Sequence, residues 1–115
     1  MIVTIDPAKK GQIDYRRSLA SVDSWFAEQQ AAGFTTSYGW RLGLAESDVT
    51  LLTGAFVLAK EAAAMGLGVP PLIDADGIPH ELTIEELTAV MLGYGQHRAA
   101  LSAEYATRRA AIPQP

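Results

Sequence analysis

The last third of the chain carries the pattern that most constrains the fold. Thr83 is followed three residues later by Glu86, the spacing of a capping box at the start of a helix. A helix that runs from there to Ile112, before Pro113 prevents continuation, would be about 45 Å long at 1.5 Å per residue. That is longer than a compact domain of 115 residues needs. Its inward stripe consists of Leu87, Val90, Tyr94, His97, Leu101 and Tyr105.

Two glycines, Gly93 and Gly95, lie in the middle of this predicted helix. Each costs a helix about 1 kcal/mol relative to alanine. They mark a bend, a close crossing with another helix, or a break into two helices. The pattern does not choose among these three interpretations.

The first 33 residues indicate another long helix. Asp6 and Pro7 are a capping carboxylate followed by proline at the first helical position. Gly11 weakens the first turns, so the helix is predicted most securely after it, and Gly33 ends the segment as a left-handed cap. The apolar face, at spacings of 4, 3 and 4, consists of Tyr15, Leu19, Val22 and Phe26.

Residues 47–65 predict a further helix, which lies between the other two along the chain. Its apolar side chains are not confined to one face. Ser47 and Asp48 provide capping side chains, and Gly66 stops the helix. A helix that is apolar on nearly every side is buried, either at the centre of the domain or against another subunit. One stripe consists of Val49, Leu52, Phe56, Ala59 and Ala63, and the other of Leu51, Ala55, Leu58 and Ala62.

Two segments between the helices carry strand and turn signals. Residues 34–44 have mostly large apolar side chains at the even positions, and Gly39 places a tight turn at their middle, so we favour a hairpin over one long strand. Asp76-Gly77 between short apolar runs predicts a second hairpin. The sequence therefore predicts a mainly helical α+β fold in a single domain, residues 1–115, with about three helices and one or two short β-hairpins.

Composition excludes several classes of function. The net charge of −4 provides no basic surface for nucleic acid, and the absence of cysteine excludes disulfides and thiolate metal sites. No stretch approaches the roughly 18 apolar residues of a membrane helix, and the N-terminus does not have the pattern of a signal sequence. We expect a soluble cytoplasmic protein that binds no nucleic acid, no membrane and no cofactor.

The acidic segment around Asp76 invites comparison with a calcium-binding loop. With Asp74 at position 1 of such a loop, position 6 is Pro79, where the tight turn requires glycine. In the register that puts Asp76-Gly77 at positions 5 and 6, position 12 is Thr83 instead of glutamate. Both registers fail, so the segment predicts a hairpin turn followed by a capping box.

Histidine is the remaining source of catalysis or metal binding, and the chain has two. His97 lies on the inward stripe with Tyr94, where a histidine more often packs and forms hydrogen bonds than catalyses. No nucleophile elbow, phosphate loop or dinucleotide motif is present, so we assign no catalytic, cofactor-binding or metal residue. The alternative is a small enzyme or ligand-binding protein that uses His97, Tyr94 and a carboxylate from the hairpin at 74–86.

A set of large side chains in the first half of the chain predicts either core packing or an interface. Core packing is the default for the aromatic residues, and a partner-facing surface is the alternative, because Trp and Tyr are enriched where subunits dock. The candidate interface residues are Trp25, Tyr38, Trp40, Val49, Leu52 and Phe56.

The order of features along residues 11–112 is distinctive: Arg16-Arg17 in the first helix, then GFTTSYGWRLGL, an apolar helix containing Gly54, the turn DADG, and ELTIEEL opening the last helix. This order resembles a family of short domains of unknown function that phages and prophages encode, commonly within or beside tail and tail-fibre genes. The resemblance carries over no catalytic residues. It implies a non-enzymatic, tail-associated structural or assembly protein that forms a homo-oligomer and contacts other phage tail proteins, in the bacterial cytoplasm during assembly or in the virion.

Overall fold

The computed structural model describes residues 6–115. Within this range the chain forms three helices and two antiparallel two-stranded hairpins, which confirms the predicted mainly helical α+β fold. In chain order the elements are α1 (Pro7–Ala32), β1 (Phe34–Thr35), β2 (Arg41–Leu42), α2 (Glu46–Ala64), β3 (Leu72–Ile73), β4 (Pro79–His80) and α3 (Ile84–Ala110).

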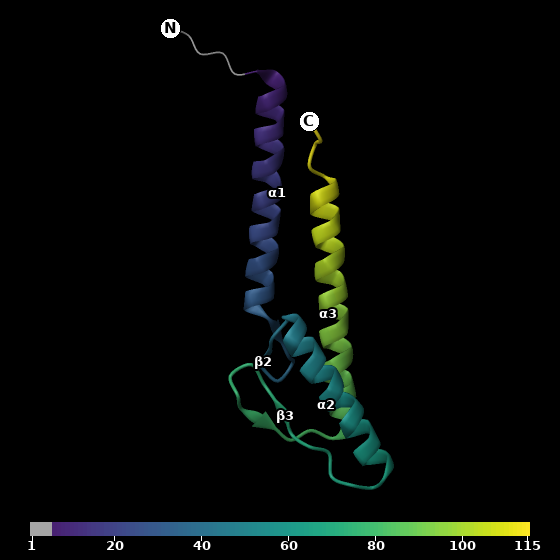
Figure 1. Cartoon of the computed structure of the whole chain (residues 1–115). Coiled ribbons are helices and arrows are strands. Elements are labelled where there is room, and N and C mark those ends of the chain that lie inside the picture. The colour runs from purple at the N-terminus through teal and green to yellow at the C-terminus, as the bar shows by residue number, and fades with distance from the viewer. Residues whose placement is uncertain (1–5) are drawn as a thin grey trace.

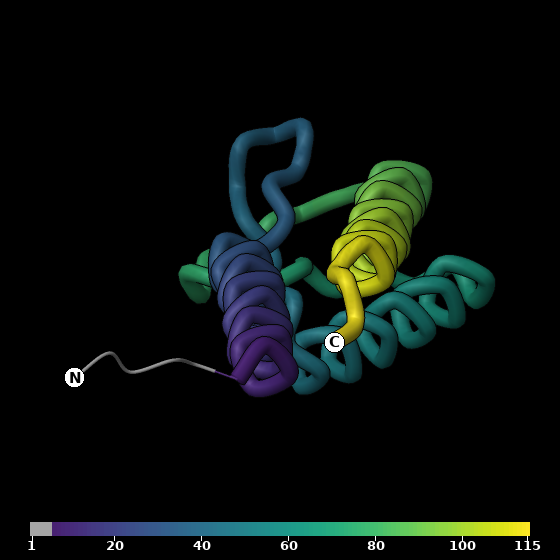
Figure 2. Tube along the Cα trace, turned by 90° about the horizontal axis from the view of Figure 1, so that it is seen from above, coloured from purple at the N-terminus to yellow at the C-terminus, as the bar shows by residue number. Residues whose placement is uncertain are grey.

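The helices are arranged as a rod. α1 and α3 run antiparallel and side by side, and α2 lies along the first half of α3 at the end that also holds the hairpins (Figures 1 and 2). The molecule measures 79 × 23 × 21 Å and its radius of gyration is 20.7 Å, whereas a compact domain of this length has a radius of about 13 Å. The long last helix therefore extends well beyond the other elements that pack around its first half.

The hydrophobic core lies at the hairpin end of the rod. Among residues 6–115, α1 contributes no buried side chain, so the other end is a pair of helices with half-buried contacts. The buried apolar residues are Leu42, Leu44, Leu52, Ala59, Leu72, Leu87, Val90, Tyr94 and Leu101.

Aromatic and charged side chains hold α1 against the second half of α3. The rings of Phe26 and Tyr105 lie 4.4 Å apart, and the Tyr105 hydroxyl donates to Asp23 Oδ1 at 2.6 Å. The guanidinium of Arg108 lies 3.7 Å from the centre of the Trp25 ring. The predicted face of α1 is confirmed, because its half-buried side chains include Tyr15, Leu19, Val22 and Phe26.

Both ends of α1 follow from local chemistry. Asp6 Oδ1 accepts a hydrogen bond from the Ala8 N–H at 3.0 Å, and Pro7 occupies the first helical position, as predicted. Gly33 ends the helix at φ 75°, and a Cβ there would lie 2.7 Å from the Leu42 carbonyl oxygen. Only glycine satisfies both the positive φ and this close approach.

The two hairpins are formed as predicted. In the first, Phe34 pairs with Leu42 and Thr35 with Arg41, and Gly39 closes the turn at φ 93°. This result confirms the hairpin over the single long strand. In the second, Leu72 pairs with His80, and Gly77 occupies the turn at φ 79°.

The start of α2 differs from the prediction. Ala45, rather than Ser47, is the residue that precedes the helix, and Asp48 lies inside the first turn. The Asp48 carboxylate reaches back and accepts a hydrogen bond from the Ala45 N–H at 3.1 Å. A carboxylate at the third helical position thus stabilises the helix start without a capping side chain at Ala45. The helix ends at Ala64, and Gly66 stops it at φ 73° as expected.

α3 is one unbroken helix of 27 residues, so Gly93 and Gly95 do not divide it. It ends at Ala110, two residues before the predicted Ile112. Gly93 marks a close approach, because a Cβ there would lie 3.3 Å from the ring of Phe34. The first hairpin can therefore pack closely on α3 at this point. No helix within residues 6–115 is long and apolar enough to cross a bilayer.

We predict that Thr83→Ala lowers the free energy of unfolding by about 1 kcal/mol, because it removes the cap of α3. The Thr83 hydroxyl accepts from the Glu86 N–H at 3.1 Å, and Glu86 accepts from the Thr83 N–H at 3.0 Å. Urea denaturation measures the change. Thr107→Ala, an exposed threonine within the same helix, is the matched control, and equal midpoints for the two variants would contradict the capping role.

Candidate functional site

A stack of three aromatic rings joins the two hairpins to the start of α3. Trp40 lies between Tyr38, with ring centres 6.0 Å apart, and His80, at 4.1 Å, and both pairs are nearly parallel at 8° and 11°. The Tyr38 hydroxyl donates to Glu86 Oε2 at 3.2 Å. Trp40 is half-buried whereas 51% of Tyr38 is exposed. The stack links the first hairpin to the second through the contact of Trp40 with His80.

The carboxylate of Asp74 organises the second hairpin. It is buried, and its Oδ1 accepts hydrogen bonds from the N–H groups of Asp76 at 2.8 Å and Ile78 at 3.0 Å. Its Oδ2 lies 2.7 Å from His80 Nε2. Because an ionised carboxylate only accepts, Nε2 carries the proton. These contacts confirm the interpretation of this segment as a turn, and they place His80 in the turn.

Hydrogen bonds shift the acidity of the two carboxylates that hold this end of the rod. The hydrogen bond from His80, followed by that from the Ile78 N–H, lowers the pKa of Asp74 below its usual value. The hydrogen bond from the Thr83 N–H does the same to the pKa of Glu86. Both groups are thus stabilised in the charged form. Within residues 6–115 no three histidine, aspartate or glutamate side chains gather as a metal site would require.

Tyr94 and His97, the residues of the alternative enzyme hypothesis, lie on the inward face of α3. The Tyr94 hydroxyl donates to the Gly43 carbonyl oxygen at 2.6 Å, and burial raises the pKa of Tyr94. The ring of His97 packs against Phe34 with centres 5.4 Å apart. Among the hydrogen bonds of residues 6–115, none joins His97 to a carboxylate of the segment 74–86. Asp74 is bonded to His80, and Glu86 to Thr83 and Tyr38.

The two apolar stripes of α2 have different environments, which sequence reasoning did not resolve. Leu52 and Ala59 are buried at 7% and 1% exposure, and Val49 and Phe56 are half-buried beside α3. The helix is not enclosed on every side, so the interpretation that it lies at the centre of the domain is wrong. Burial of the helix against another subunit stays a prediction. Its second stripe faces away from the core, because α3 covers only one side of the helix.

We define the outer stripe as Leu51, Ala55 and Leu58. Leu51 is 73% exposed and Leu58 is 58% exposed. Leu51 and Ala55 line a hollow of about 330 Å³ together with Ile73 of β3, which is itself 52% exposed. The outer stripe and the edge of the second hairpin therefore form one exposed apolar surface, of the kind that marks an interaction site.

A groove lies on the other side of α2, where it packs against α3. We call it the α2–α3 groove, and its volume is about 610 Å³. Leu92, which is 62% exposed, forms part of its apolar wall. Two cations, Lys60 and Arg98, also line it, and within residues 6–115 neither forms an ion pair. The other lining residues include Val49, Thr53, Phe56, Ile84, Thr88 and Met91.

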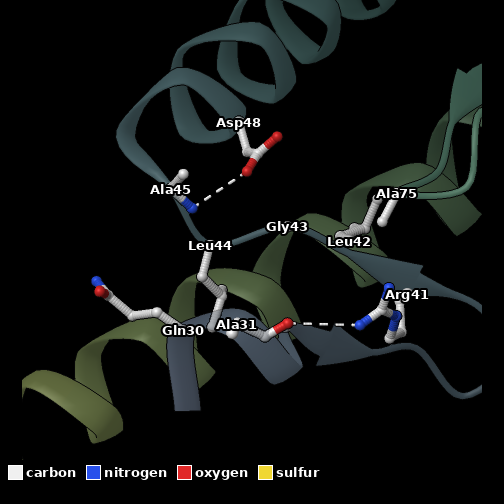
Figure 3. Close-up of a pocket in the computed structure, with 10 residues that line it drawn as sticks. Gln30, Ala31, Arg41, Leu42, Gly43, Leu44, Ala45, Asp48 and Ala75 are labelled. Atoms are coloured by element: carbon white, nitrogen blue, oxygen red, sulfur yellow. Dashed lines mark hydrogen bonds between the residues drawn. The ribbon is translucent and has the colours of Figure 1, made fainter. Parts of the chain in front are cut away.

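A third hollow, of about 340 Å³, lies where the end of α1 meets the start of α2 (Figure 3). Its charged groups are used by the helix ends. Arg41 donates to the carbonyl oxygens of Ala31 at 3.5 Å and Ala32 at 3.2 Å, and Asp48 accepts from Ala45. Figure 3 shows both side chains directed at backbone atoms. This hollow is thus a junction between elements.

The predicted interface residues fall into different environments. Trp25 is covered by Arg108 and Trp40 lies within the ring stack, whereas Leu52 belongs to the core. Tyr38 is exposed, and Val49 and Phe56 border the α2–α3 groove. Sequence reasoning missed Leu58, Leu92 and their neighbours as surface residues, because hydrophobicity alone does not tell which stripe of α2 meets α3.

Residues 14–115 match the model of a protein family described as a domain of unknown function (DUF4376). No curated protein and no solved structure matches the chain.

We predict that the stabilising effect of Asp74 depends on pH. Its lowered pKa means that the contribution to stability is present above the unfolded pKa, about 4, and is lost as the pH falls through the lower folded value. Asp74→Asn should therefore reduce the free energy of unfolding at pH 7, and the difference from the natural protein should shrink between pH 4 and pH 2.

Urea denaturation across this pH range measures the effect. Asp76→Asn is the matched control, because the Asp76 carboxylate is exposed and its contact with Arg41 is 3.9 Å long. A difference between Asp74→Asn and the natural protein that stays constant with pH would show that the turn does not depend on the ionised carboxylate.

Proposed function

The chain belongs to the DUF4376 family, and we propose that it is a non-enzymatic structural or assembly module that associates with further copies of itself. We further propose that it is a tail-associated phage or prophage protein, present in the bacterial cytoplasm during assembly or in the virion, where it also contacts other tail proteins. The phage assignment rests on the order of features along residues 11–112, and the neighbouring genes test it directly.

The exposed apolar surface of α2 is the observation that carries the self-association. Leu51 and Leu58 are more than half exposed and lie on the same face, seven residues apart. Burying one large aliphatic side chain contributes about 1.5–3 kcal/mol, so two leucines with Ala55 and Ile73 supply a sizeable part of the cost of association. A partner surface would remove this apolar area from water.

The shape of the molecule supports a structural role. The rod is 79 Å long, and its second half consists of two helices without a buried side chain on α1. The polar groups of the predicted alternative site are used for packing, since the Tyr94 hydroxyl bonds to the backbone at Gly43. This use of Tyr94 supports an assignment without catalysis.

We predict that the protein forms oligomers at micromolar concentration. Leu51→Glu should weaken the association constant about tenfold or more, because it places a charge in the apolar surface that association would bury. Sedimentation velocity over a concentration series measures both effects. Ile13→Glu is the matched control, since Ile13 is 45% exposed on α1 at the other end of the rod. A monomer mass for the natural protein across the series would contradict the proposal.

A further inference from the structure

The outer stripe and the α2–α3 groove lie on opposite sides of α2. Successive residues of a helix are rotated by about 100°, which places Leu51 and Leu58 roughly 180° from Lys60 around the helix axis. Both surfaces are accessible at once, because one borders β3 and the other borders α3. A partner that used one surface would leave the other free.

The two surfaces match in length. Leu51 and Leu58 of the outer stripe are separated by about 10 Å along the helix. The groove has an apolar wall and spans α2 from Val49 to Lys60, which is about 16 Å. An exposed helical stripe of two to three turns therefore fits within its length.

The charges at the ends of the two surfaces are opposite. α2 and α3 run antiparallel, and the Tyr94 hydroxyl meets Gly43 just before α2 begins. Arg98 therefore lies at the end of the groove near Val49, and Lys60 lies at the other end. Glu61, which is exposed, lies beside the outer stripe towards the end of α2, whereas Asp48 in the first turn already accepts a hydrogen bond from Ala45.

A symmetric pairing of two outer stripes agrees less well with these charges. Two copies of α2 that paired through their outer stripes would bring only carboxylates to the contact, so no opposite charges would meet there. Such a pair would also leave Lys60 and Arg98 without partners in the groove. Docking of the stripe into the groove instead brings the exposed carboxylate of Glu61 to a surface that carries the cations Lys60 and Arg98.

On the basis of the proposed self-association, we propose that the outer stripe of α2 in one copy docks into the α2–α3 groove of the next copy. This contact joins two different surfaces, so it repeats from copy to copy and builds an open, head-to-tail assembly. It forms a ring only if the rotations between successive copies add up to a full turn. A chain of elongated subunits of this kind is suited to a structural role.

Two variants test the contact because each removes one surface. Leu51→Glu damages the stripe and leaves the groove, whereas Leu92→Glu damages the groove and leaves the stripe. Sedimentation velocity should show that the natural protein grows with concentration beyond a dimer and that each variant alone is monomeric. An equimolar mixture of the two should form a heterodimer and stop there, since only one intact stripe and one intact groove can meet.

Several outcomes would overturn the contact. The first is that the natural protein forms a closed dimer and that Leu92→Glu leaves this dimer intact. The second is that the mixture of the two variants stays monomeric. The third is that the natural protein is itself monomeric. In the first two cases self-association stands and only the head-to-tail contact fails, whereas the third rejects both. If circular dichroism shows that Leu92→Glu does not fold, Arg98→Glu replaces it as the groove variant, and unchanged assembly of Arg98→Glu contradicts the contact.

Discussion

The packing of one face of α3, from Leu87 to Leu101, is the interaction on which the rest of the structure depends. Leu87, Val90, Tyr94 and Leu101 of α3 form one buried cluster with residues of α2 and of both hairpins. Tyr94 anchors the segment before α2 through Gly43, and the first hairpin approaches α3 closely at Gly93. Because the buried face ends at Leu101 and the 27-residue helix continues to Ala110, its last turns are left to pair with α1 through half-buried contacts, and the molecule becomes a rod.

The same constraint explains why α2 has two exposed apolar surfaces. Only one side of the helix can pack against α3, so Leu52 and Ala59 are buried while Leu51 and Leu58 face water. The edge of the contact with α3 forms the groove that holds Lys60 and Arg98. Because α3 continues beyond the core instead of folding back over α2, apolar surface stays exposed on both sides of α2. Self-association is a physical means of covering this surface.

Local signals were predictable from the sequence, and long-range pairings were not. The capping box at Thr83, the turn at Gly77 and the end of α1 at Gly33 depend on residues close together in the chain. Which of the two stripes of α2 is buried depends on where α3 lies. Because both stripes consist of apolar residues, the sequence of α2 does not decide it. The contact of Trp40 with His80 joins two hairpins, so no spacing reveals it. The link between Asp74 and His80 was accessible in principle, because a hairpin with its turn at Asp76-Gly77 brings those positions close together.

Disulfide cross-linking tests the central claim most directly, because the chain has no cysteine of its own. Single variants Leu51→Cys and Leu92→Cys would be mixed under mild oxidation, and the covalent dimers would be identified by mass spectrometry of peptides. The head-to-tail contact predicts that position 51 of one copy joins position 92 of another faster than either position joins itself. Preferential pairing of 51 with 51 would instead indicate a symmetric dimer, and cross-linking no faster than that of Ile13→Cys would contradict association through α2.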